Sequence, residues 1–140
     1  MKNTFVTENE NDTVRAGVKI GKNARPGDVY ALFGDLGAGK TAFVRGMAEG
    51  MGITERVTSP TFALVHEYGD KIKLYHFDMY RISGTDDLES TGWYDYLAGN
   101  GVIAVEWSEN IVDALPDHCK KIIIERIDEQ KRRITICDGE

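Results

Sequence analysis

The sequence predicts an α/β protein with a three-layer fold, in which a mixed central sheet includes an antiparallel hairpin. A glycine-rich phosphate-binding pattern at residues 34–41 lies between a strand-like apolar run and a helical pattern. Two further apolar runs, at residues 74–78 and 102–106, each end in a carboxylate. A glycine turn at residues 69–70 separates two β-rich stretches, which predicts the hairpin.

The loop pattern G-x-x-x-x-G-K-[ST] is matched by Gly34-Asp35-Leu36-Gly37-Ala38-Gly39-Lys40-Thr41. We expect the backbone N–H groups of Leu36, Gly37, Ala38 and Gly39 to face phosphate oxygens, because glycines let the chain curl tightly. Lys40 is expected to reach the β- and γ-phosphates, and the Thr41 hydroxyl to ligate Mg²⁺. The strand expected at Val29–Phe33 and the helical spacing after Thr41, with Gly50 and Gly52 as its stop, are typical of a P-loop NTPase-like fold.

The two runs that end in an acid supply the second half of such a site. The run into Glu106 is uniformly apolar, as expected for a strand buried on both faces beside the loop strand, so we assign Glu106 to the metal. Asp78 is expected to be a second carboxylate near Mg²⁺ or the attacking water. The candidate catalytic residues are therefore Lys40, Asp78 and Glu106, and the candidate metal ligands are Thr41 and Glu106.

Residues around these acids add further candidates. Trp107 either packs near the nucleotide or presents a surface to a partner, and packing is favoured. Glu109 is a candidate ligand contact, because open α/β sheets bind ligands at the carboxyl ends of their strands. Arg132 or Arg133, on a later strand, is a candidate to approach the nucleotide, although exposed strand arginines usually do nothing specific.

The remaining elements are predicted from the spacing of apolar residues and from the turn-forming and capping residues between them. A first strand is expected at Thr4–Val6. A polar, acidic stretch at residues 8–12, rich in helix N-cap candidates, follows it, and then a helix that ends near Lys22. Thr13 is either a wall for the adenine or, more commonly for threonine, a helix cap. Thr61, in a rigid Ser-Pro-Thr turn, is either a switch-like Mg²⁺ contact or part of a plain turn.

Two hairpins complete the expected sheet. The first joins strands at Phe62–Tyr68 and Ile72–Phe77. The second joins strands at Lys121–Ile127 and Arg132–Cys137.

Composition limits the function. The 140 residues, of which 41% are hydrophobic and 29% charged, are expected to form one domain over residues 1–140. A net charge of −6 argues against a protein that binds nucleic acid without partners. Cys119 and Cys137 have no metal-like spacing, and no apolar run approaches transmembrane length. We therefore expect a cytoplasmic protein that does not contact a membrane.

Four segments together resemble the TsaE family, the small ATPases of the bacterial tRNA threonylcarbamoyladenosine modification machinery. These segments are Gly34-Asp35-Leu36-Gly37-Ala38-Gly39-Lys40-Thr41, Ser59-Pro60-Thr61-Phe62, His76-Phe77-Asp78-Met79-Tyr80-Arg81 and Val105-Glu106-Trp107. The resemblance implies that Lys40 and Thr41 serve phosphate and Mg²⁺, that Glu106 serves the metal, that Asp78 supports hydrolysis and that Trp107 lies near the nucleotide.

The resemblance also implies ATP and Mg²⁺ as cofactors and the TsaB and TsaD proteins as partners, with tRNA reached only through those partners. Two departures from the family pattern are Ala42, where a second Thr is common, and Ser108, where Pro is frequent. Neither removes a group assigned above.

Other functions remain open at this point. A small-molecule or nucleotide kinase shares the loop but needs an acceptor pocket and usually an arginine-rich lid, which the sequence does not indicate. A GTPase is disfavoured because no N-K-x-D segment occurs. A binding module with incidental hydrolysis is the remaining alternative.

Overall fold

The computed structural model describes residues 2–35, 38–60, 64–83 and 85–138. In chain order, its elements are β1 (Lys2–Thr7), α1 (Glu10–Asn23), β2 (Val29–Phe33), α2 (Lys40–Gly50), β3 (Val65–Tyr68), β4 (Leu74–Asp78), α3 (Thr85–Glu89), α4 (Trp93–Leu97), β5 (Val102–Glu106), the 3₁₀ helix η1 (Ser108–Ala114), β6 (Lys120–Arg126) and β7 (Arg132–Cys137). None of the helices in the described ranges is long and apolar enough to cross a membrane.

The seven strands of the described ranges form one mixed sheet in the order β1-β7-β6-β2-β5-β4-β3. The loop strand β2 lies in the middle, parallel to β5 and β6, and β5 is parallel to β4. At one edge of the sheet, β3 and β4 form an antiparallel hairpin. At the other edge, β6 and β7 form a second antiparallel hairpin, and β1 pairs antiparallel with β7. Both expected hairpins are confirmed, although β4 begins at Leu74 and leaves Ile72 in the turn. Phe62, where the first strand of the first hairpin was expected to begin, lies outside the described residues.

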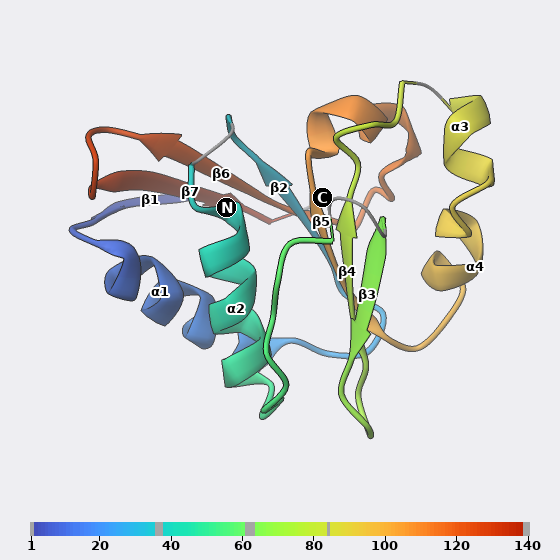
Figure 1. Cartoon of the computed structure of the whole chain (residues 1–140), viewed down its shortest axis with the longest axis horizontal. Coiled ribbons are helices and arrows are strands. Elements are labelled where there is room, and N and C mark those ends of the chain that lie inside the picture. Colours follow the sequence, from blue (N-terminus) through green and yellow to red (C-terminus); the bar gives the residue numbers. More distant parts are fainter. Residues whose placement is uncertain (1, 36–37, 61–63, 84, 139–140) are drawn as a thin grey trace.

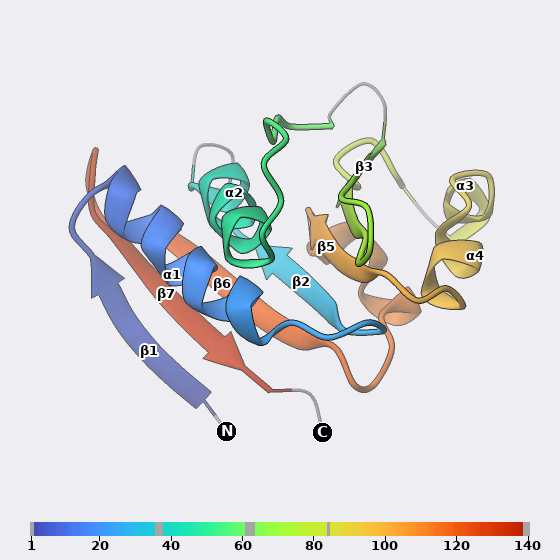
Figure 2. The same cartoon turned by 90° about the horizontal axis from the view of Figure 1, so that it is seen from below.

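Helices cover the two faces of the sheet, and Figures 1 and 2 show α1 and α2 together on one side with α3 and α4 on the other. Successive side chains of β2 point to opposite faces of the sheet, so they pack in two different cores. Tyr30 and Leu32 pack in the core under α2, whereas Val29 and Ala31 pack in the core with Trp93 of α4. The expected three-layer α/β fold is therefore confirmed.

Helix α1 begins one turn before Thr13, and its N-cap is Asn9, whose side chain accepts a hydrogen bond from the N–H of Asp12 at 2.9 Å. The interpretation of Thr13 as the cap is therefore wrong, because the Asn9 side chain already bonds a free N–H in the first turn of the helix. Further along, α1 meets α2 backbone to backbone. A Cβ placed on Gly17 or Gly46 would overlap a carbonyl oxygen of the other helix, so only glycine permits this approach.

Candidate functional site

The phosphate-binding pattern forms the connection between the central strand β2 and the first turn of α2. Gly39, just before α2, has a left-handed φ of 103°, and a Cβ on Gly34 would overlap the carbonyl oxygen of Ile124. These positions therefore require glycine. The first turn of α2 contains no acidic residue, so the helix itself places no carboxylate at the positive end of its dipole. Leu36 and Gly37 lie outside the described residues.

A cavity of about 770 Å³ opens over this loop, which is within the range usual for small-molecule sites. The sequence-predicted residues that line it are Thr13, Ala38, Gly39, Lys40, Thr41, Asp78, Glu106, Trp107 and Arg132. The first turn of α1, Ser59, Tyr80 and the β6–β7 turn complete its walls. The loop, both acids and the tryptophan thus share one cavity.

Lys40 is buried, with 4% of its surface exposed. Its ammonium donates to the carbonyl oxygen of Gly34 and lies 3.7 Å from the ring centre of Trp107. Burial lowers the Lys40 pKa, and the neighbouring carboxylates of Glu109, Glu106, Asp78 and Asp35 oppose that shift. A desolvated cation in this position gains more from an anionic ligand than an exposed lysine would.

The acids Asp78 and Glu106 are opposite each other on the parallel strands β4 and β5, and each is only 4% exposed. Glu106 Oε2 accepts a hydrogen bond from the Thr41 hydroxyl at 2.9 Å and lies 2.6 Å from His76 Nε2. Asp78 Oδ1 accepts from the N–H of Tyr80 at 2.9 Å. The two carboxylates are thus buried side by side at the floor of the cavity.

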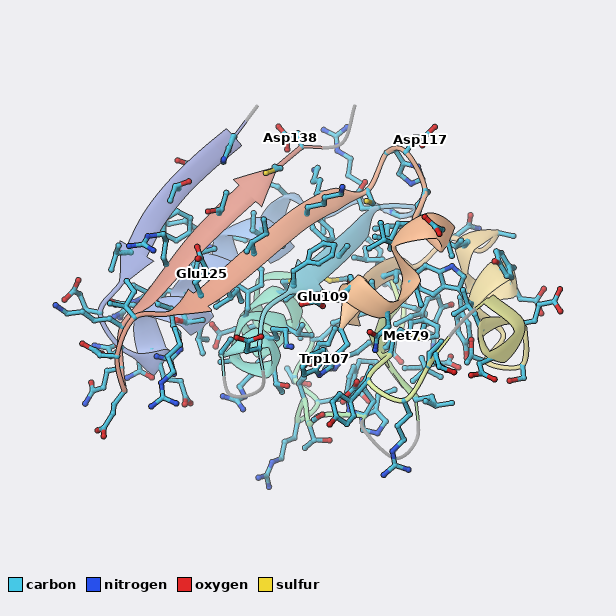
Figure 3. The ribbon with its side chains drawn as sticks, turned by 90° about the horizontal axis from the view of Figure 1, so that it is seen from above. Met79, Trp107, Glu109, Asp117, Glu125 and Asp138 are labelled. Carbon is cyan, nitrogen blue, oxygen red and sulfur yellow. The ribbon has the colours of Figure 1, made fainter. Side chains whose placement is uncertain are left out.

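Trp107 and Glu109 lie close together at the start of η1, as Figure 3 shows. Trp107 has a left-handed φ of 58°, which is uncommon for a residue other than glycine, and its ring packs on Tyr80 at 5.0 Å between ring centres. Glu109 is exposed and accepts a hydrogen bond from the N–H of Gly34 at 2.9 Å. Glu109 therefore contacts the loop backbone itself.

Two other sequence candidates approach the loop from the opposite side. Thr13 is buried, its hydroxyl is 2.8 Å from that of Thr7, and it lines the cavity. Arg132 donates from Nε to the carbonyl oxygen of Ala38 at 2.8 Å, whereas Arg133 is exposed. Thr61, the switch candidate, lies outside the described residues.

The oxygen groups here suit a divalent cation that brings other ligands with it. Among the described residues there is no group of three or more His, Cys, Asp or Glu side chains able to hold a metal ion. Thr41 and Glu106 instead offer one hydroxyl and one carboxylate at 2.9 Å from each other. Mg²⁺ is commonly bound in this way, through few protein oxygens together with substrate phosphates and water.

Sequence reasoning missed His76 as part of this site. It is fully buried and bonded to Glu106, yet a lone histidine in a strand carries no signal of its own. A signal was available in the spacing, because residues two apart on a strand share a face and Asp78 was already a candidate.

A central parallel strand, a glycine loop, and a lysine and threonine at the start of the next helix define the P-loop class of α/β proteins. The chain also matches the family model "Threonylcarbamoyl adenosine biosynthesis protein TsaE" over residues 7–134. It therefore belongs to the TsaE family.

Individual relatives agree with this. A protein of Bacillus subtilis (strain 168) named tRNA threonylcarbamoyladenosine biosynthesis protein TsaE is 49% identical over 113 residues, which cover 80% of this chain and 70% of the relative. A protein of the same name from Treponema pallidum is 38% identical over 131 residues, 94% of this chain and 97% of that one. The crystal structure of Bacillus subtilis YdiB is similar, with a TM-score of 0.83 and 38% identity over 100% of this chain and 87% of that chain.

Proposed function

We propose that this protein is a cytoplasmic, Mg²⁺-dependent ATPase that serves tRNA threonylcarbamoyladenosine biosynthesis together with TsaB and TsaD. The observation that carries the proposal is the meeting of Lys40, Thr41 and Glu106 at one cavity over the loop. One sheet carries both the loop and the acids, which supports a single ATPase domain over residues 1–140. The tRNA step in the names of the relatives supports the pathway.

Triphosphate binding requires Lys40 to change partners. Its ammonium is held by the Gly34 carbonyl and the Trp107 ring, and both are neutral. A phosphate oxygen carries a full charge and forms a stronger, charge-assisted hydrogen bond. Lys40 is thus expected to leave these partners for the β- and γ-phosphates, while the loop N–H groups and the α2 N-terminus bind the remaining oxygens.

Thr41 and Glu106 are the residues that would hold Mg²⁺. When bound there, the ion would neutralise negative charge that develops on the phosphate oxygens. Asp78 is proposed to accept a hydrogen bond from the attacking water, and its position opposite Glu106 in the register supports this role. Attack of that water on the γ-phosphorus releases ADP and phosphate.

Hydrolysis by the isolated chain is expected to be slow. The Arg132 guanidinium donates hydrogen bonds to the carbonyl oxygens of Ala38, Asp128 and Lys131, so it stabilises the conformation of the loop and of the β6–β7 turn. An arginine supplied by a partner typically accelerates such reactions by about 10³–10⁵-fold. Dependence on TsaB and TsaD would follow, and the net charge of −6 favours tRNA contact through those partners.

The test is reconstitution of the modification reaction with TsaB, TsaD and either wild-type protein or Lys40→Ala. We expect Lys40→Ala to lose nucleotide binding, partner-stimulated ATP hydrolysis and modified tRNA, because the loop loses its only side-chain cation. The control is Lys71→Ala, which removes an exposed lysine in the β3–β4 turn and should leave all three unchanged.

Equal hydrolysis and modification by Lys40→Ala and wild type would contradict the proposal. A non-hydrolysable ATP analogue in the same assay separates turnover from assembly, since support by the analogue would show that binding alone suffices. Phosphorylated small-molecule products would instead favour a kinase.

A further inference from the structure

We propose that His76 is a positioning residue of this site, which fixes the orientation of the Glu106 carboxylate and thereby the strength with which the site binds Mg²⁺. The inference rests on the proposed function, because it assigns a role at the same magnesium site. It concerns a buried group that the hydrolysis scheme above does not use.

The strand register brings the two side chains together. His76 is opposite Ala104 on β5, and the pair Asp78 and Glu106 comes two residues later on the same face. The methyl side chain of Ala104 leaves room beside it, and His76 Nε2 lies 2.6 Å from Glu106 Oε2. The imidazole thus lies directly beneath the carboxylate, on the side away from the cavity mouth.

The hydrogen bonds define which proton His76 carries. Glu106 Oε2 already accepts the Thr41 hydroxyl, so it acts as a carboxylate acceptor toward His76 as well. The imidazole must therefore donate through Nε2–H. Its Nδ1 is buried and has no hydrogen-bond partner among the described residues.

This arrangement gives His76 a role that Thr41 cannot fill. Both donors act on Oε2, but Thr41 is also the candidate metal ligand. If its hydroxyl turns to Mg²⁺, His76 is the donor that continues to hold Oε2. Hydrogen-bond partners behind metal ligands typically account for about 10–100-fold in metal affinity.

A role confined to fold stability is the alternative, and two variants separate it from positioning. His76→Gln keeps an N–H donor at about the distance of Nε2 from the backbone. His76→Leu keeps a similar buried volume but has no donor. His76→Leu is expected to lose stability as well, because the buried Glu106 carboxylate then has one donor fewer, so the measurement that separates the two roles is the effect of Mg²⁺ on nucleotide affinity.

The experiment measures the affinity of a non-hydrolysable ATP analogue by calorimetry, with Mg²⁺ and with EDTA, alongside thermal unfolding. We expect His76→Leu to reduce the gain in affinity due to Mg²⁺ about tenfold while its affinity in EDTA stays near that of wild type. His76→Gln should retain the gain within about threefold. Lys40→Ala, by contrast, should lose affinity under both conditions.

Equal loss of the Mg²⁺-dependent gain in both variants, or a full gain in folded His76→Leu, would overturn the inference. If His76→Leu does not fold, ¹⁵N-resolved spectra of the wild-type imidazoles decide, because the inference requires a proton on Nε2 of His76. An Nε2 without a proton would overturn it. Wild-type protein that bound no nucleotide at all would instead contradict the proposed function.

Discussion

Replacement of Gly46 by alanine tests the close contact between α1 and α2. A Cβ at this position would overlap the carbonyl oxygen of Val14, lie 2.8 Å from its carbonyl carbon and lie 3.0 Å from the Cα of Gly17. Ordinary contact begins at 3.4 Å. The opposing atoms are all backbone, so no side chain can rotate aside and the two helices must separate.

The expected cost combines two opposing effects. Alanine in a helix is more favourable than glycine by about 1 kcal/mol. Overpacking of a rigid contact costs about 1–3 kcal/mol, and backbone on both sides places this case at the upper end. We therefore expect a net loss of about 2 kcal/mol in the free energy of unfolding, which corresponds to about 4–8 °C in Tm.

Urea denaturation of Gly46→Ala and wild type measures this loss. The control is Glu49→Ala, an exposed position on the same helix, which should change stability by less than about 0.5 kcal/mol. Because α1 carries Asn9 and Thr13 to the wall of the cavity, we also expect weaker nucleotide binding by Gly46→Ala. A variant as stable as wild type would refute the contact geometry.

Two further predictions concern the site itself. Thr41→Val, which keeps the shape and removes the hydroxyl, should weaken Mg²⁺-dependent nucleotide binding about tenfold in calorimetry and leave binding in EDTA near wild type; an equal loss under both conditions would argue against a metal role. Tryptophan fluorescence should change when Mg-ATP is added, because Lys40 lies on the Trp107 ring, whereas Trp93 is fully buried on the other face. The change should vanish in Trp107→Phe, and its persistence there would contradict this contact.

Local patterns were sufficient to predict most of the fold. The β2–loop–α2 unit, the helix α1 and both hairpins follow from period, glycine turns and apolar runs, all of which act within a few residues. The exact ends of the strands could not be predicted from local patterns. Ile72 is as good a strand residue as Leu74, and the register of β4 on β5 decides where pairing begins.

The site was predictable where a residue type carries its own chemistry. The loop and the acids at the ends of β4 and β5 were recognisable by residue type and spacing, and the structure brings them to one cavity. His76 and the placement of Lys40 on Trp107 depend on the pairing of distant strands and on a left-handed residue at 107, which no local pattern specifies. The sequence placed N-cap candidates within residues 8–12 but did not single out Asn9, because Asp12 and Thr13 are equally good caps by residue type.

A structure of the protein with Mg²⁺ and a non-hydrolysable ATP analogue tests the central claim most directly. We expect the triphosphate in the loop, the Lys40 ammonium moved from the Gly34 carbonyl and the Trp107 ring to the β- and γ-phosphates, and Mg²⁺ beside Thr41 and Glu106. A triphosphate bound away from the loop, or a Lys40 ammonium still on the Gly34 carbonyl in the occupied site, would contradict the account.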